Sequence, residues 1–246
     1  MMSEVVLQVF RGTTREQGEL KEYRVPYVEG MVVLDALHYI QANYDGDLAV
    51  RWNCKAAKCG SCSAEVNGKP RLTCKTRIDS LPKDEPIRVY PMRAFPLIKD
   101  LVTDVSWNYE AKKRIPPFTP DKNTDWIMFQ EDIDRLQEFR KCIECFLCQN
   151  VCHILRDHGR KDAFFGPRLM IKIAELEMHP KDILDRTEFL RKEAGVGFCN
   201  ITKCCTEVCP EGIHITDNGI IPLKERVVDR YFDPLMWIFR KISGRR

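Results

Sequence analysis

The chain is 246 residues long, with a formal net charge of +3, 44% hydrophobic residues and 30% charged residues. This is the composition of an ordinary globular protein, and the length suits one or two domains. The modest charge argues against a dedicated nucleic-acid binder, which concentrates basic residues on one face, and no stretch approaches the roughly 20 apolar residues of a membrane-spanning helix.

The first hundred residues predict a small α+β unit that ends near residue 105. Strands are expected at residues 5–10, 23–28, 63–66, 71–74 and 87–90. Asn67-Gly68, between the third and fourth of these strands, is typical of a tight hairpin turn. Apolar residues at helical spacing predict a helix over residues 33–43.

A cysteine-rich loop separates that helix from the hairpin. Its C-x4-C-x2-C spacing, with a later fourth cysteine, is formed by Cys54, Cys59, Cys62 and Cys74. Plant-type ferredoxins hold a [2Fe–2S] centre with this spacing. Gly60 and Ser61 allow backbone N–H groups to turn toward the inorganic sulfides, and such hydrogen bonds help to set the reduction potential. A zinc site is the alternative, but the x4 gap and the distant fourth cysteine suit zinc poorly.

Prolines punctuate residues 92–125, which predicts a crossover segment without a continuous helix. Beyond it, apolar residues share helical faces in three stripes: Ile133, Leu136 and Phe139; Leu169, Ile173 and Leu176; Ile220, Leu223, Val227 and Tyr231. Pro167, directly after Gly166, suits the start of the second of these helices. We therefore expect two domains, residues 1–105 and residues 106–246, the second mostly α-helical.

The second half carries two related cysteine runs. The first is Cys142-x2-Cys145-x2-Cys148-x3-Cys152, the spacing of bacterial ferredoxins. The second run has the same spacing and ends in Pro210, with its four positions filled by Cys199, Thr202, Cys205 and Cys209. It is the same motif with threonine in place of the second cysteine.

The fourth cysteine of each such run ligates the cluster of the other run. Cross-pairing therefore assigns a [4Fe–4S] cluster to Cys142, Cys145, Cys148 and Cys209. The other cluster is left with three thiolates, Cys152, Cys199 and Cys205. Three thiolates hold three irons and leave the fourth corner without a ligand, which predicts a [3Fe–4S] cluster.

Cys204 stands outside this register, next to Cys205. Two roles are open for it. It is either a small buried hydrophobic side chain, the commoner role of a free cysteine, or a thiolate that replaces Cys205 or adds a fourth ligand, which makes the last cluster [4Fe–4S].

Disulfides are the alternative for all twelve cysteines. Residues 1–10 lack the basic start and the apolar run of a secretory signal. Without an exported context, cysteines at motif spacing are interpreted as metal ligands.

Further short motifs accompany these cysteines. They are the Gly60-Ser61-Cys62 ending of the first loop with Cys74 twelve positions on, Pro-Leu-Ile-Lys-Asp-Leu-Val at residues 96–102, Gly166-Pro167, and Cys209-Pro210. Over nearly its whole length, the chain resembles the iron–sulfur subunits of the succinate dehydrogenase and fumarate reductase family. The resemblance implies a β-grasp ferredoxin domain of plant type, then an all-α ferredoxin domain of bacterial type with two clusters.

The resemblance also implies a function as an electron-transfer subunit of succinate dehydrogenase, without an acid, base or nucleophile of its own. In that family a flavoprotein subunit oxidises succinate at FAD, and electrons pass singly through the clusters to a quinone beside the [3Fe–4S] centre, against transmembrane anchor subunits. The protein then lies on the cytoplasmic face of a bacterial cell membrane. A fumarate reductase running in reverse, or a ferredoxin-like subunit of another flavin-linked dehydrogenase, is the alternative.

Two positions depart from the family pattern. His153 follows Cys152 where the family usually has proline, and Asn200 follows Cys199 where many succinate:ubiquinone enzymes have histidine. Residues 154–157 also lack the tryptophan that those enzymes place near the quinone. The resemblance places His153 and Asn200 in the quinone vicinity and favours a menaquinone-type site. His153 either assists proton delivery there or is a surface histidine with no such role.

The C-terminal segment at residues 235–239 is apolar, contains Trp237, and is followed by basic residues. Such a segment suits a membrane interface or the anchor subunit. A helix packed on its own domain is the alternative.

Overall fold

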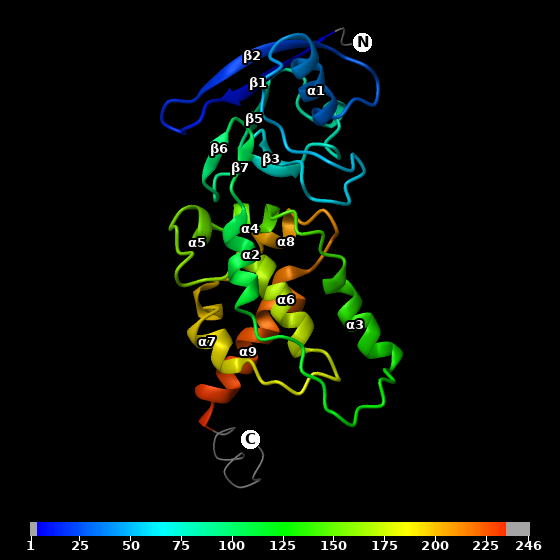
Figure 1. Ribbon diagram of the computed structural model, residues 1–246, viewed down its shortest axis with the longest axis vertical. Helices are drawn as coiled ribbons and strands as arrows, with labels where there is room; N and C mark the ends of the chain where they lie inside the picture. The colour runs from blue at the N-terminus through cyan, green and yellow to red at the C-terminus, as the bar shows by residue number, and fades with distance from the viewer. Residues whose placement is uncertain (1–3, 235–246) are drawn as a thin grey trace. The chain divides into compact units, whose positions relative to one another are not determined.

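The computed structural model describes residues 4–234, and the chain divides into two compact units (Figure 1). The first unit contains the residues up to 106 together with residues 143–151 and 208–211. The second contains residues 107–142 and 152–207, and continues from residue 212. Two segments that follow residue 105 in sequence therefore belong to the first unit. The division of the sequence into domains 1–105 and 106–246 stays a prediction.

A five-stranded mixed sheet forms the centre of the first unit. Its strands are β1 (Glu4–Arg11), β2 (Glu19–Pro26), β3 (Ser63–Val66), β4 (Lys69–Leu72) and β5 (Ile87–Tyr90). Their order is β2-β1-β5-β3-β4, in which β1 and β5 are parallel and the other neighbours are antiparallel. With helix α1 (Val33–Asn43) between β2 and β3 in the chain, this confirms the predicted β-grasp-like fold.

Strand pairing explains two boundaries that differ from the sequence prediction. β2 begins at Glu19, earlier than expected, because its antiparallel ladder runs the full length of β1. β4 occupies Lys69–Leu72 because Asn67 and Gly68 adopt left-handed φ angles of 48° and 74°. A two-residue turn of this kind brings Val66 directly opposite Lys69.

Helix α1 contributes the main apolar face against this sheet. The side chains that it buries are Val33, Leu34, Ala36, Leu37 and Ile40. Most of them join one core cluster with strand residues such as Leu7, Val25 and Val89. The predicted helical spacing is confirmed. The cysteine loop follows this packed helix in the chain.

The segment 143–151 completes the first unit and ends in helix α4 (Leu147–Val151). Phe146 and Leu147 join an apolar cluster with Met92 and Phe95. The side chain of Asn150, fully buried, donates to Oε1 of Glu65 at 2.8 Å. Its own oxygen accepts the backbone N–H of Ala94 at 2.9 Å. The segment is therefore fastened to the sheet by both apolar and polar contacts.

Short elements connect these larger ones. Residues 97–103 form a small antiparallel hairpin of β6 (Leu97–Lys99) and β7 (Val102–Thr103), and two 3-10 turns lie at Ile78–Ser80 and Val196–Phe198.

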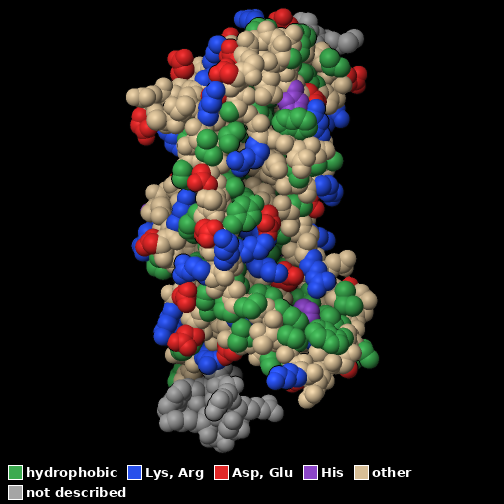
Figure 2. Space-filling model, viewed as in Figure 1, with side chains coloured by type: hydrophobic (Ala, Val, Ile, Leu, Met, Phe, Trp, Pro, Cys, Tyr) green, Lys and Arg blue, Asp and Glu red, His purple; other side chains and the backbone are tan. Residues whose placement is uncertain are grey.

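The second unit is α-helical, as predicted. Its helices are α2 (Ser106–Lys113), α3 (Gln130–Arg140), α5 (His153–Arg156), α6 (Pro167–Glu177), α7 (Thr187–Lys192), α8 (Cys204–Glu207) and α9 (Ile221–Tyr231), with a π-helical turn at Ile215–Ile220. Among the described residues, no helix is both long and apolar enough to cross a bilayer. The face in Figure 2 carries basic and acidic side chains interspersed, without one basic patch.

Helix α2 corrects the expectation that residues 92–125 hold no continuous helix. It fits into the proline-free stretch between Pro96 and Pro116, so that no proline falls in its interior. The prolines therefore leave between them a stretch long enough for a short helix.

Helix α6 is the most buried helix of the second unit. Leu169, Ile173 and Leu176 are buried as predicted, and Pro167 stands at the first helical position after Gly166. The π-helical turn approaches this helix closely, since a Cβ added to Gly219 would lie 2.7 Å from Cδ1 of Ile171. The turn leads directly into α9, whose Leu223 and Val227 are buried.

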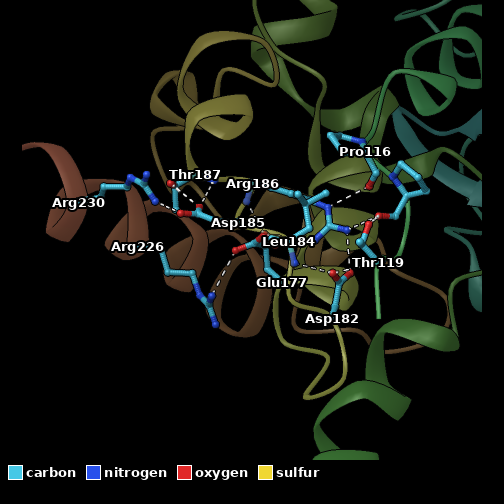
Figure 3. Close-up of polar contacts among 11 residues, drawn as sticks. Pro116, Thr119, Glu177, Asp182, Leu184, Asp185, Arg186, Thr187, Arg226 and Arg230 are labelled. Atoms are coloured by element: carbon cyan, nitrogen blue, oxygen red, sulfur yellow. Dashed lines mark hydrogen bonds and ion pairs between the residues drawn. The ribbon is translucent and has the colours of Figure 1, made fainter. Parts of the chain in front are cut away.

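A buried arginine connects two loop segments of the second unit through ion pairs and hydrogen bonds (Figure 3). The side chain of Arg186 is 0% exposed and forms ion pairs with Asp182 at 2.7 Å and Glu177 at 3.5 Å. It also donates to the backbone carbonyls of Pro116 at 3.0 Å and Pro117 at 2.6 Å. One guanidinium thus joins the segment before α3 to the segment between α6 and α7.

We expect Arg186→Met to destabilise the second unit by about 3–5 kcal/mol, because it leaves buried carboxylates without their cation. Denaturant unfolding of the full chain, followed by circular dichroism, measures the change in midpoint. The matched control is Lys192→Met, which removes an exposed ion pair with Glu188 and costs about 0.5 kcal/mol or less. Equal midpoints for the two variants would contradict a structural role of Arg186.

Candidate metal centres

The loop from Cys54 to Cys62 is folded so that backbone amides face a cysteine sulfur. Lys55, Ala57 and Gly60 adopt left-handed φ angles of 53°, 55° and 69°. As a result, Sγ of Cys54 accepts hydrogen bonds from the backbone N–H groups of Ala56 and Lys58, each at 3.3 Å. Such N–H groups stabilise a thiolate and suit an iron-bound sulfur.

The four cysteines of the first set lie together in the first unit. Burial alone would raise the pKa of Cys59, but hydrogen bonds with Ser61 and Cys54 outweigh it and lower that pKa to about 6. Burial and a hydrogen bond with Cys62 raise the pKa of Cys74 to about 11, and the charge of Cys54 adds to this. The all-thiol donor set and the inward N–H groups fit an iron–sulfur cluster.

Gly60 and Ser63 join this loop to the second cysteine set. Oγ of Ser63 lies 2.9 Å from the carbonyl oxygen of Gly60 and 2.8 Å from that of Cys145, so its hydroxyl donates between the two loops. A Cβ added to Gly60 would lie 2.7 Å from Cα of Cys145. Glycine is therefore required here both for its φ and for its small size.

Three cysteines predicted to hold the [4Fe–4S] cluster belong to the first unit: Cys145, Cys148 and Cys209. Cys145 and Cys148 are buried. The short segment that carries Cys209 is held by Lys75, whose Nζ donates to the carbonyl of Pro210 at 3.0 Å. Cys142, the fourth predicted ligand, directly precedes this unit's second segment in the chain.

The two cysteine runs share one backbone pattern. In the first run, Glu144 and Phe146 flank Cys145 at φ angles of 54° and 60°. In the second run, Ile201 and Lys203 flank Thr202 at φ angles of 63°. Four non-glycine residues in this sparsely populated conformation, at corresponding positions, show that both loops turn in the same way. Thr202 therefore occupies the position that Cys145 holds in the first run.

The third set lies within the second unit. Cys152 and Cys205 are buried, while Cys199 and Cys204 are half-buried. Burial raises the pKa of Cys205 to about 11, against a hydrogen bond with Thr216 that lowers it, and the charges of Cys204, Cys199 and Cys152 raise it further. Oγ1 of Thr216 lies 3.3 Å from Sγ of Cys205.

The contact with Thr216 was not predicted. Thr216 lies in the π-helical turn and belongs to no motif, so only the fold brings it to the sulfur.

A site for a single metal ion differs from a cluster site because its ligands converge on one atom. Within residues 4–234, no three His, Cys, Asp or Glu side chains converge as the ligands of one ion. Ligands of an iron–sulfur cluster bind different irons and therefore stand further apart.

Two models of iron–sulfur domains match separate parts of the chain. Residues 6–110 match a model described as a 2Fe-2S iron–sulfur cluster binding domain, and residues 138–213 match a 4Fe-4S dicluster domain. The chain is 31% identical over 224 residues to the fumarate reductase iron–sulfur subunit of Mycobacterium tuberculosis, covering 87% of this chain and 89% of that one. It is 30% identical over 220 residues to the succinate dehydrogenase iron–sulfur subunit of Bacillus subtilis, covering 80% and 81%.

The fold of one solved structure agrees with that of this chain over nearly its full length. A chain of the Mycobacterium smegmatis Sdh1 complex in the apo form superposes with a TM-score of 0.92 at 58% identity, covering 95% of this chain and 99% of that one. The chain belongs to the succinate dehydrogenase and fumarate reductase iron–sulfur subunits.

Membership in the succinate dehydrogenase and fumarate reductase iron–sulfur subunits confirms three predictions. The chain is an electron-transfer iron–sulfur subunit of the succinate dehydrogenase and fumarate reductase family, it combines a [2Fe–2S] domain with a dicluster domain, and its fold is the one expected. The ligand assignment of individual cysteines stays a prediction.

The two residues predicted near the quinone contact each other in this iron–sulfur subunit. Nδ2 of Asn200 lies 2.8 Å from Nε2 of His153, although the two residues are far apart in sequence. Each directly follows a cysteine of the third set, Cys199 or Cys152. The fold thus brings a titratable ring and an amide to one edge of that set.

We expect Gly60→Ala to lower the content of the [2Fe–2S] and [4Fe–4S] clusters, because its Cβ collides with Cys145. The matched control is Gly68→Ala, since Gly68 also has a left-handed φ of +74° but nothing within 4 Å of its Cβ. That control should lose about 1 kcal/mol of stability and keep its iron. Iron and acid-labile sulfide per chain measure the cluster content of the two variants. Equal cluster content would contradict the close packing of the two loops.

Proposed function

We propose that the protein holds three centres: [2Fe–2S] at the first cysteine set, [4Fe–4S] at the second and [3Fe–4S] at the third. The ligand sets are Cys54, Cys59, Cys62 and Cys74; Cys142, Cys145, Cys148 and Cys209; and Cys152, Cys199 and Cys205. Clusters held by these cysteines would supply one-electron transfer between a flavin and a quinone.

One observation carries the three-iron assignment. Thr202 stands at the ligand position of a loop whose backbone repeats that of the Cys145 loop. A threonine hydroxyl is a hard donor that stays protonated at neutral pH, whereas iron in these clusters prefers soft thiolates. The third set therefore offers three in-register thiolates and leaves one corner of a cubane without a motif ligand.

The chain's own residues bind the sulfurs and tune them. The amides of Ala56 and Lys58 donate to the Cys54 sulfur, and the hydroxyl of Thr216 lies next to the Cys205 sulfur. Hydrogen bonds to ligand sulfurs favour the more negative, reduced state and so raise the reduction potential. Ser63 holds the first loop against Cys145, which keeps the two ligand sets at a short separation.

His153 and Asn200 support a quinone site beside the third set. A quinone takes up protons as well as electrons, and histidine is the side chain that most often transfers protons in catalysis. The Asn200 amide orients the ring through its contact with His153 Nε2. The family resemblance favours menaquinone as the acceptor or donor.

The partners follow from the family. They are an FAD-containing flavoprotein subunit, which converts succinate and fumarate, and transmembrane anchor subunits that hold the protein at the cytoplasmic face of the membrane. A solved relative belongs to an Sdh1 complex, which supports assembly with other subunits. The apolar segment 235–239, predicted to meet the anchor, lies outside the described residues.

The direction of electron flow is proposed as succinate oxidation. The similarity at 58% identity to a chain of an Sdh1 complex favours it. Fumarate reduction is the second candidate, since a fumarate reductase subunit is 31% identical.

Low-temperature EPR of the anaerobically purified complex tests the three centres. We expect a [3Fe–4S] signal in the oxidised sample and a [2Fe–2S] signal that grows on reduction. Thr202→Cys should abolish the three-iron signal by supplying the missing thiolate, whereas the isosteric control Thr202→Val should keep it. A full complement of iron without a three-iron signal in the wild-type sample would contradict the proposal.

We expect His153→Asn to slow quinone reduction at least about 10-fold, because the proton carrier is lost. Activity with a soluble acceptor that takes electrons at the flavin should be unchanged. His158→Asn is the matched control, since its ring lies 6.2 Å from that of His153. EPR verifies that the clusters remain. An equal loss with both acceptors would argue against a quinone role.

A further inference from the structure

Cys204 lies beside the third cysteine set but outside the three-thiolate ligand set proposed above. Its Sγ lies 3.3 Å from Oγ1 of Thr202. The thiol therefore contacts the residue at the missing ligand position.

The corresponding residue of the first run has a different environment. There, Leu147 is 1% exposed within an apolar cluster. Cys204 also begins a helix, α8, as Leu147 begins α4, but Cys204 is only half-buried. Its placement therefore differs from that of the core residue which the repeated loop has at this point.

We propose that Cys204 is a conditional fourth ligand, which binds a fourth iron at the corner left open by Thr202 and converts the third centre to [4Fe–4S]. The inference rests on the proposed [3Fe–4S] centre. Ferrous iron from solution is the ligand taken up, and a soft thiolate is the donor that it prefers in such clusters.

The conversion balances without an external oxidant or reductant. The Cys204 thiol loses one proton to water, and its sulfur forms one bond to the incoming ferrous ion. That ion joins the cluster in its reduced state, so no electron enters or leaves the protein. Because reduction potential depends on cluster type, uptake of iron changes how readily the last centre passes electrons onward.

The exposure of the cysteines gives the direction of entry. Cys152 and Cys205 are 8% and 6% exposed, whereas Cys204 is the half-buried thiol next to Thr202, which is exposed. Ferrous iron therefore reaches the open corner from the Cys204 side without displacing a buried ligand.

The test uses the intact complex, reduced anaerobically, incubated with ferrous iron and desalted. Bound iron per complex and the three-iron EPR signal after reoxidation in the absence of oxygen are measured together. We expect the wild type to gain about one iron and lose most of the signal, and Cys204→Ala to gain none and keep it. Glu207→Gln, at the exposed end of the same helix, is the matched control and should behave as wild type.

The outcomes separate this inference from the proposed function. A wild-type complex that shows the three-iron signal but takes up no iron overturns the role of Cys204 and leaves the [3Fe–4S] centre standing. Equal uptake by Cys204→Ala overturns it as well. A wild-type complex without the signal from the start contradicts the [3Fe–4S] centre. In that case, a signal that appears in Cys204→Ala supports Cys204 as a ligand, and continued absence overturns it.

Discussion

The cysteine loops depend on backbone conformations that their residues do not favour. Six non-glycine residues in these loops are left-handed: Lys55, Ala57, Glu144, Phe146, Ile201 and Lys203. Each such residue costs about 1–2 kcal/mol relative to the right-handed form. In the first loop, this conformation turns the amides of Ala56 and Lys58 toward the sulfur of Cys54. The cost is therefore offset by metal binding, and we infer that folding of these loops and loading of iron and sulfide are coupled.

Buried polar contacts hold the loops where that coupling requires them. Glu65 is 2% exposed and accepts from Asn150 as well as from Arg93, whose Nε lies at 2.8 Å. This carboxylate joins the sheet to the segment that carries Cys145 and Cys148. Since a buried charge is tolerated only when it is paired and hydrogen-bonded, the contact specifies one position for the segment. In the second unit, a buried cation has the corresponding role: the guanidinium of Arg186 is paired with the carboxylate of Asp182.

Local signals predicted the features that depend on neighbouring residues. The Asn67-Gly68 turn, the apolar face of α1 and the Pro167 start of α6 are each determined within a few positions of the chain. The cysteine spacing likewise predicted the two kinds of iron–sulfur domain. Helix α2 was missed because proline content was averaged over a segment, although a helix needs only the stretch between prolines.

Other features depend on residues far apart in sequence and had no local signal. Asn200 meets His153, and Thr216 meets Cys205, only because the second unit folds as it does.

The discontinuous first unit has a consequence for synthesis on the ribosome. Residues 143–151 and 208–211 complete this unit, and they are translated long after β5. A nascent chain that ends before them lacks Phe146 and Leu147, which share an apolar cluster with Met92 and Phe95 in the finished unit. Domains that emerge first usually fold first. Here the amino-terminal unit has to wait for most of the carboxy-terminal one, and during that interval its apolar surface is open to chaperones and to misassembly.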